Sequence, residues 1–184
     1  MSISPLPKRS AEPATAPRAA SGAWPFYDDD EIAAVTEVLL SGRVNQWTGE
    51  CVKAFETAFA SYIGQPHAVA VFNGTVALEL SLRALGIGAG CEVIVSPRSF
   101  MASASAVALV GATPIFADVD PDSGNISAQT IAPMLTERTR AILPVHLAGW
   151  PADMPAIIVN VGSMLAGKHE GARLGACTDC RKFW

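Results

Sequence analysis

The sequence has few charged residues and no long apolar run. Charged side chains make up 16% of the 184 residues, and the formal net charge is −4 at pH 7. It therefore lacks the clustered positive charge that attracts nucleic acid, and no nucleic-acid partner is expected. No apolar run approaches the roughly 20 residues that span a bilayer, and the N-terminus lacks a signal peptide's apolar core. The expectation is a cytoplasmic globular protein with no membrane partner.

Cysteines are also scarce. Cys51, Cys91, Cys177 and Cys180 do not suggest a disulfide framework in a chain of this size. The last two, with His169, could suggest metal ligation, but one C-x-x-C pair without a second ligand pair is a weak signal, so no metal site is expected. Hydrophobic residues are plentiful at 50%, which predicts a substantial core.

Composition divides the chain into three parts. Residues 1–23 are rich in proline, alanine and serine. They have almost nothing to bury, cannot offset the entropy lost on ordering, and are predicted to be a disordered tail. Residues 24–155 are predicted to form the folded domain. Residues 156–184 do not continue its pattern and are interpreted as an atypical tail.

Two helices are predicted at the start of the folded part. Ile32, Val35 and Val38 share one face of a helix that follows an acidic cluster and ends near Gly42. A second helix is predicted from about Glu50 to Tyr62, because apolar side chains recur there at three- or four-residue spacing.

Strand and helix patterns alternate from His67 onward. The predicted strands are His67–Phe72, Glu92–Val95, Thr113–Ala117 and Arg140–Val145, and the predicted helices are Val76–Leu85, Met101–Val110 and Ser127–Leu135. This alternation predicts a parallel sheet with right-handed crossovers, in which ligands bind beyond the carboxyl ends of the strands. The turns at those ends carry Asn73-Gly74-Thr75, Pro97-Arg98-Ser99-Phe100, Asp118 and His146.

The turn Asn73-Gly74-Thr75 joins a predicted strand to a predicted helix. A helix start presents unpaired N–H groups and a positive dipole end, which favour an anion, typically a phosphate. Gly74 allows close approach to the backbone, and Thr75 can cap the helix or donate a hydroxyl hydrogen bond. The alternative is an ordinary capped turn.

A longer series of motifs makes a family resemblance specific. It comprises Gly42-Arg43, Gly49, Phe55-Glu56, Asn73-Gly74-Thr75-x-Ala77-Leu78, Gly86-Ile87-Gly88-x-Gly90-x-Glu92-Val93-Ile94, Pro97-x-x-Phe100, Gly111-Ala112-x-Pro114, Asp118-Val119-Asp120, Asn125-Ile126, Thr139-Arg140-Ala141-Ile142 and Pro144-Val145-His146-Leu147-x-Gly149. In order and spacing, the series resembles the DegT/DnrJ/StrS family of pyridoxal-phosphate sugar aminotransferases. The resemblance implies an incomplete α/β large domain of the aspartate-aminotransferase-like fold (fold type I), with helices on both faces of a mainly parallel sheet.

The resemblance also implies a cofactor, a substrate and site residues. Gly74 and Thr75 would hold the phosphate of pyridoxal 5'-phosphate, and Phe100 would stack on its pyridine ring, unless Phe100 is simply a core residue. The family transfers an amino group, usually from glutamate, to the keto group of a nucleotide-linked sugar, and its members usually form homodimers. Asp118 and His146 are assigned no chemistry, because such residues more often cap turns or serve structural roles.

Two elements of the family are not found in the sequence. These are the aspartate that pairs with the pyridine nitrogen and the Schiff-base lysine, since Asp179, Lys168 and Lys182 lack the expected context. The chain is therefore expected to be truncated and inactive, with weak cofactor binding or none. One hypothesis is a frameshift, because one back-translation of residues 169–184, shifted by one nucleotide, resembles the family's next helix and strand. A non-catalytic cofactor-binding or regulatory relative is the alternative.

A third interpretation is a nucleotide-binding module. The sequence from Gly162 to Lys168 follows the apolar run Ile157–Val161 and imitates a phosphate-binding loop. His169 stands where that motif requires serine or threonine, and too little chain follows to complete such a domain.

Overall fold

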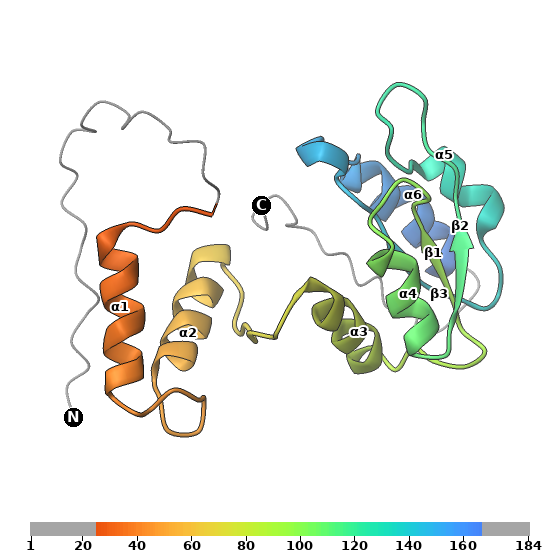
Figure 1. Cartoon of the computed structure of the whole chain (residues 1–184). Coiled ribbons are helices and arrows are strands. Elements are labelled where there is room, and N and C mark those ends of the chain that lie inside the picture. Colours follow the sequence, from red (N-terminus) through yellow and green to blue (C-terminus); the bar gives the residue numbers. More distant parts are fainter. Residues whose placement is uncertain (1–24, 167–184) are drawn as a thin grey trace. The chain divides into compact units, whose positions relative to one another are not determined.

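The structure is a computed structural model and describes residues 25–166 (Figure 1). Internal contacts divide the chain into two compact units, Met1–Val69 and Ala70–Trp184. We call their described parts the helical unit and the sheet unit. Across residues 25–166, no helix is both long enough and apolar enough to cross a membrane.

The helical unit contains the two predicted helices. Helix α1 spans Asp29–Leu40, and the Asp28 N–H donates to Glu31 Oε2 at 2.8 Å, which satisfies one N–H at the helix start. Helix α2 spans Cys51–Ile63 and ends at Gly64, whose φ of 68° places it in the left-handed conformation that stops helices. Both predictions from capping residues and spacing are confirmed.

These two helices bury almost none of their residues. No residue of α1 is buried, and Ala60 is the only buried residue of α2. The rings of Phe55 and Phe59 stack with centroids 5.7 Å apart, yet the Phe55 side chain remains 57% exposed. Helical spacing therefore identified the helices, although their apolar faces form no core within the helical unit.

The predicted strand His67–Phe72 is wrong. This segment is irregular, and Val69 and Phe72 are 71% and 95% exposed. A strand needs a neighbour for its N–H and C=O groups. Central strand β1 already has a neighbour on each side, and in the described part of the chain no strand pairs with residues 67–72.

The sheet unit is built on three parallel strands. Strand β1, Glu92–Val95, lies between β2, Thr113–Phe116, and β3, Thr139–Leu143. The three predicted strands in this region are thus confirmed as a parallel sheet, although β3 ends two residues earlier than expected. Pro114 lies in edge strand β2, where its missing N–H costs no ladder hydrogen bond.

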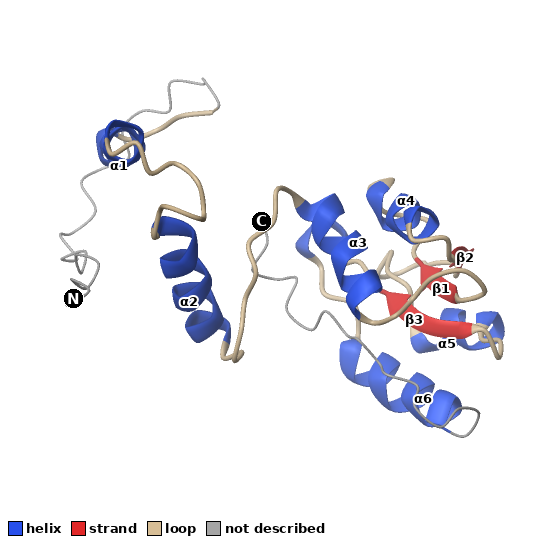
Figure 2. Cartoon of the chain, turned by 90° about the horizontal axis from the view of Figure 1, so that it is seen from below, coloured by secondary structure: helices blue, strands red, loops and turns tan. Residues whose placement is uncertain are grey.

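Helices cover both faces of this sheet (Figure 2). On one face, α3 (Gly74–Ala84) and α4 (Ala102–Leu109) pack over Val93 and Val95 through Leu82 and Val107. On the other face, α5 (Ala128–Ile131) and α6 (Met154–Ala166) pack over Ile94. Alternate residues of β1 therefore supply two cores, and the predicted α/β class with helices on both faces is confirmed.

Short 3₁₀ segments complete the sheet unit. The first, η1 (Ala132–Met134), continues α5, so the predicted helix to Leu135 is divided at Pro133. The second, η2 (Leu147–Gly149), follows β3 and includes Ala148 with a φ of 51°. Ala148 therefore adopts a left-handed conformation that is unusual for a residue other than glycine.

Helix α6 covers part of the region that was expected to be an atypical tail, residues 156–184. It runs continuously across the expected domain boundary after residue 155. Residues 162–166 are helical and follow no strand, so the phosphate-loop interpretation is wrong. The expected tail of residues 1–23, and Lys168, His169, Cys177, Asp179, Cys180 and Lys182, lie outside the described residues.

Candidate functional site

The carboxyl edge of the sheet brings together the turns that the sequence singles out. The segment of residues 85–91 links the end of α3 to the start of β1, so α3 begins at the opposite, carboxyl edge. Helix α4 crosses from β1 back to parallel strand β2, so it also begins at the carboxyl edge. Because α3 packs against α4, two helix N-termini lie at this edge on the same face of the sheet.

The start of α3 has free hydrogen-bond donors. Asn73 Oδ1 accepts from the Val76 N–H at 2.9 Å and so caps the third helical residue. Within residues 25–166, the N–H groups of Gly74 and Thr75 and the Thr75 hydroxyl donate to no partner. A Cβ on Gly74 would meet no atom within 4 Å, so this backbone is open to a ligand. The turn can therefore bind a small anion through three donors.

Phe100 precedes Met101, the N-cap residue of α4, and is 79% exposed. The alternative that it belongs to the core is therefore wrong. Nearby, the hydroxyl oxygens of Ser99 and Ser103 are 2.6 Å apart, which ties the turn to the first helical residues. An exposed ring in an ordered turn offers an apolar face to a planar ligand.

Asp118 and His146 have local structural partners. Asp118 Oδ1 accepts from the Val119 N–H at 2.8 Å. His146 Nδ1 accepts from the Ala152 N–H at 3.0 Å, which places the proton of the neutral ring on Nε2. Both contacts are local hydrogen bonds that shape the loops at the carboxyl edge.

Asn125 holds two loops of the carboxyl edge together, a role that sequence reasoning missed. Its side chain is buried, its amide group donates to the Trp150 carbonyl at 2.9 Å, and its Oδ1 accepts from the Leu147 N–H at 3.1 Å. These bonds join the loop after β2 to the loop after β3. Asn125 stands in one of the family motifs, but the motif alone does not reveal its partners.

The loop before Asn125 is organised by a carboxylate. Asp120 Oδ1 accepts from the Ser123 N–H at 2.9 Å and the Ser123 hydroxyl at 3.0 Å. These hydrogen bonds lower the pKa of Asp120, because they favour its charged form.

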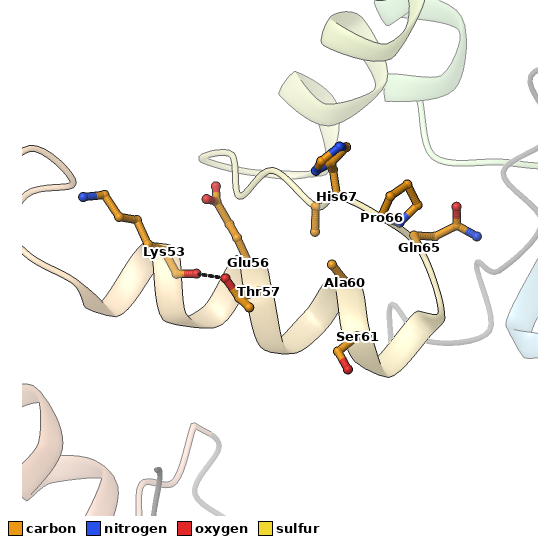
Figure 3. A pocket seen from close by; sticks show the side chains of 9 residues that line it. Lys53, Glu56, Thr57, Ala60, Ser61, Gln65, Pro66 and His67 are labelled. Carbon is orange, nitrogen blue, oxygen red and sulfur yellow. Dashed lines mark hydrogen bonds between the residues drawn. The ribbon is translucent and has the colours of Figure 1, made fainter. Parts of the chain in front are cut away.

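A separate hollow of about 430 Å³ lies in the helical unit between α2 and the chain that follows it (Figure 3). It is lined by Lys53, Glu56, Thr57, Ala60, Ser61, Gln65, Pro66, His67 and Ala68. The Thr57 hydroxyl bonds within α2, to the Lys53 carbonyl at 2.8 Å, and Lys53 Nζ lies 3.5 Å from Glu50 Oε1. The hollow contains none of the predicted site residues.

Comparison with known proteins identifies the family. The pattern of the DegT/DnrJ/EryC1/StrS aminotransferase family matches residues 25–160. The chain belongs to this family. The family match confirms the resemblance that the sequence motifs indicate.

Curated relatives show how much of such an enzyme the chain spans. It is 43% identical over 135 residues to 3-amino-5-hydroxybenzoate synthase of Amycolatopsis mediterranei, covering 73% of this chain and 35% of the relative. It is 45% identical over 134 residues to the spore coat polysaccharide biosynthesis protein SpsC of Bacillus subtilis, with 73% and 34% coverage. A match to GDP-perosamine synthase of Caulobacter vibrioides, at 38% identity, covers 89% of this chain and 47% of the relative. The chain therefore spans between about a third and a half of these relatives.

Solved structures agree with the fold. An aminotransferase from Psychrobacter cryohalolentis is similar with a TM-score of 0.74 and 50% identity, over 77% of this chain and 36% of that one. NtdA from Bacillus subtilis, solved with bound cofactor PMP, is similar with a TM-score of 0.70 and 33% identity, over 75% and 32% of the two chains. The sheet unit is therefore part of a fold-type-I aminotransferase domain.

The local geometry fits a phosphorylated pyridine cofactor, which the family implies. The start of α3 supplies donors for a phosphate through Gly74 and Thr75. Phe100 supplies an exposed aromatic face at the start of the neighbouring helix. No described residue has to move to free these groups.

Proposed function

We propose that the sheet unit supplies the phosphate-binding turn and one ring-facing residue of a pyridoxal-phosphate aminotransferase. The observation that carries this proposal is that the N–H groups of Gly74 and Thr75 and the Thr75 hydroxyl have no partner among residues 25–166. The family match supports the identity of the anion as the cofactor phosphate. Phe100, 79% exposed, is the residue that would cover the ring.

Each residue has a distinct physical role. The N–H groups of Gly74 and Thr75 donate to phosphate oxygens at the positive end of the α3 dipole, and the Thr75 hydroxyl adds a third donor. The Phe100 ring orients the pyridine plane and excludes water from one side of it. When bound, pyridoxal phosphate supplies the electron sink that amino transfer requires.

The proposed reaction is amino transfer, with glutamate as donor, to the keto group of a nucleotide-linked sugar in polysaccharide or secondary-metabolite biosynthesis. The names of GDP-perosamine synthase and of the spore coat polysaccharide protein SpsC support this substrate class. We further propose a cytoplasmic homodimer. The exposed apolar faces of α1 and α2 are consistent with burial in a larger assembly.

For the 184-residue chain by itself, we propose reversible cofactor binding without amino transfer. The family's Schiff-base lysine and its pyridine-pairing aspartate have no counterpart in the sequence. Without these two groups, the chain can contact the phosphate and the ring but can neither attach the cofactor covalently nor hold its nitrogen protonated.

Titration of the chain with pyridoxal phosphate, followed by cofactor absorbance and tryptophan fluorescence, tests the proposal. Thr75→Ala removes one phosphate donor and should weaken uptake about tenfold. Thr57→Ala, which removes a hydroxyl bonded within α2, is the matched control and should leave uptake unchanged. Phe100→Ala should also weaken uptake.

Borohydride reduction followed by mass spectrometry distinguishes reversible cofactor binding from covalent attachment to a lysine. Recovery of the unmodified chain supports reversible binding, whereas a cofactor adduct on a lysine would contradict the absence of covalent attachment. Failure of the chain to take up pyridoxal phosphate at all, or equal uptake by the Thr75→Ala variant, would overturn the assignment of the phosphate-binding turn.

A further inference from the structure

Arg98 differs from the other arginines of the sheet unit. Arg83 pairs with a glutamate in α3, Arg138 pairs with Glu92, and Arg140 donates to two backbone carbonyls. The guanidinium of Arg98 makes no hydrogen bond or ion pair with any residue from 25 to 166. Among residues 25–166, this cation therefore has no polar partner.

The Arg98 side chain nevertheless lies in a defined place. It starts in the turn after β1, where the Ser96 hydroxyl accepts from the Arg98 N–H at 3.2 Å. A Cβ on Gly124 would lie 2.5 Å from Arg98 Nη1 and 3.6 Å from Leu147 Cδ2. The guanidinium therefore occupies the space that a side chain at residue 124 would fill.

The two loops beside the guanidinium are fixed to each other. Asn125 follows Gly124 and bonds to the Leu147 N–H and the Trp150 carbonyl. Gly124 itself is buried, and its φ of 68° disfavours other residues there. The exposed Arg98 side chain thus lies beside ordered backbone at the carboxyl edge of the sheet, where α/β folds bind ligands.

The acidic residues of the neighbouring loop do not neutralise this charge. Asp118 accepts from the Val119 N–H, Asp120 accepts from the Ser123 N–H and hydroxyl, and no carboxylate of the described chain lies within ion-pair distance of Arg98. A guanidinium presents its donors in a planar fork that matches a carboxylate or phosphate with two hydrogen bonds.

We propose that Arg98 is a specificity-determining residue that binds an oxyanion of the substrate. The proposal rests on the proposed function, which places substrate chemistry at this edge, but it concerns a group separate from the cofactor phosphate at the start of α3. Two substrates of the proposed reaction carry such a group: the amino donor carries a carboxylate, and the nucleotide-linked sugar carries a diphosphate.

Binding measurements on the full 184-residue chain separate these sources. Ligand-observed NMR titration with glutamate and, independently, with UDP gives a dissociation constant for each probe. Arg98→Ala should weaken binding of one of the two probes about ten- to a hundredfold. Arg98→Lys should recover only part of this loss, because lysine keeps the positive charge but lacks the planar pair of guanidinium donors. Arg140→Ala, which removes an exposed arginine bonded to backbone carbonyls, is the matched control and should bind as the unmodified chain does.

The Gly124→Ala variant tests the position of the Arg98 guanidinium while keeping its positive charge. Its added Cβ displaces the guanidinium, so binding of the same probe should weaken, while circular dichroism verifies that the variant is folded. Failure of the unmodified chain to bind either probe, or equal losses for the Arg98→Ala and Arg140→Ala variants, would overturn the proposal. Pyridoxal-phosphate uptake is measured separately on each variant. Unchanged uptake by Arg98→Ala distinguishes loss of the substrate oxyanion from failure of the cofactor site.

Discussion

The helical unit and the sheet unit differ in how much apolar surface they bury. Helix α1 buries no residue and α2 buries only Ala60, although both carry apolar side chains at helical spacing. In the sheet unit, Val93, Ile94 and Val95 are completely buried. Because amphipathic helices gain most of their stability from packing their apolar face, the stability of the described chain resides in the sheet unit.

This difference shows that apolar spacing and a completed core are separate properties. Spacing identifies the face that a helix would bury, but a core also requires an opposing surface. The sheet supplies that surface for α3, α4, α5 and α6. Within the helical unit itself, nothing equivalent covers Ile32, Val35 or Leu39, which are 54%, 61% and 63% exposed.

The largest expected effect comes from the centre of the sheet. Ile94→Ala should destabilise the chain by about 2–5 kcal/mol, because it leaves a cavity between β1 and the helices of one face. Ile32→Ala, the same change at an exposed position of α1, should alter stability by less than about 0.5 kcal/mol. Urea unfolding followed by circular dichroism measures both, and equal losses would remove the contrast between the units.

A smaller effect is expected from a buried carboxylate at the start of β1. The Glu92 side chain is 3% exposed, pairs with Arg138 and accepts from the Thr136 hydroxyl. Glu92→Gln should cost about 1–3 kcal/mol, because it removes charge-assisted hydrogen bonds from a buried site.

The surface counterpart of the Glu92→Gln variant is Glu79→Gln. Glu79 pairs with Arg83 at 2.8 Å on the surface of α3, and their side chains are 29% and 56% exposed. Its loss should cost about 0.3–0.5 kcal/mol and should diminish in high salt. If thermal unfolding gave the same loss for both glutamates, burial would not be the source of the difference.

Local sequence signals predicted much of the fold. Gly64 ends α2 in the left-handed conformation, and the predicted strand Glu92–Val95 coincides with β1. These features depend on backbone preferences and spacing over a few residues. The position of Phe100 at the carboxyl edge also followed from the predicted strand Glu92–Val95, whereas the strand predicted before Gly74 and Thr75 is absent and their place at this edge comes from the direction of α3. The roles of all three residues toward a cofactor stay predictions.

Features that depend on distant partners could not be predicted in the same way. The segment His67–Phe72 has the apolar composition of a strand but no pairing partner among the described residues. The partners of Asn125 lie 22 and 25 residues further along the chain. A local sequence pattern shows that a segment could form a strand or a hydrogen bond. Whether it does so depends on which distant segment the fold brings beside it.

Asn125 tests whether buried polar contacts contribute more to stability than exposed ones, and the expected effect is of intermediate size. Asn125→Ala leaves the Leu147 N–H and the Trp150 carbonyl without their partner and should cost about 1–2 kcal/mol. Asn45→Ala is the counterpart in the helical unit, where Asn45 Oδ1 accepts from the exposed N–H groups of Trp47 and Thr48. Its cost should stay within about 0.5 kcal/mol, because water replaces the lost acceptor. Faster hydrogen exchange at Leu147 in the Asn125 variant would locate the effect, and unchanged exchange would contradict it.

The smallest expected effect is a pH dependence at the surface of the sheet unit. Hydrogen bonds from Ser123 lower the pKa of Asp120 in the folded chain relative to its unfolded value. The stability that this carboxylate contributes is therefore present above that unfolded pKa and is lost as the pH falls through the folded pKa. Asp120→Asn keeps an acceptor but cannot titrate, so its melting temperature should fall less than that of the unmodified chain between pH 5 and pH 3. Parallel pH profiles for the two proteins would show that the ionised Asp120 side chain contributes nothing to the stability of the sheet unit.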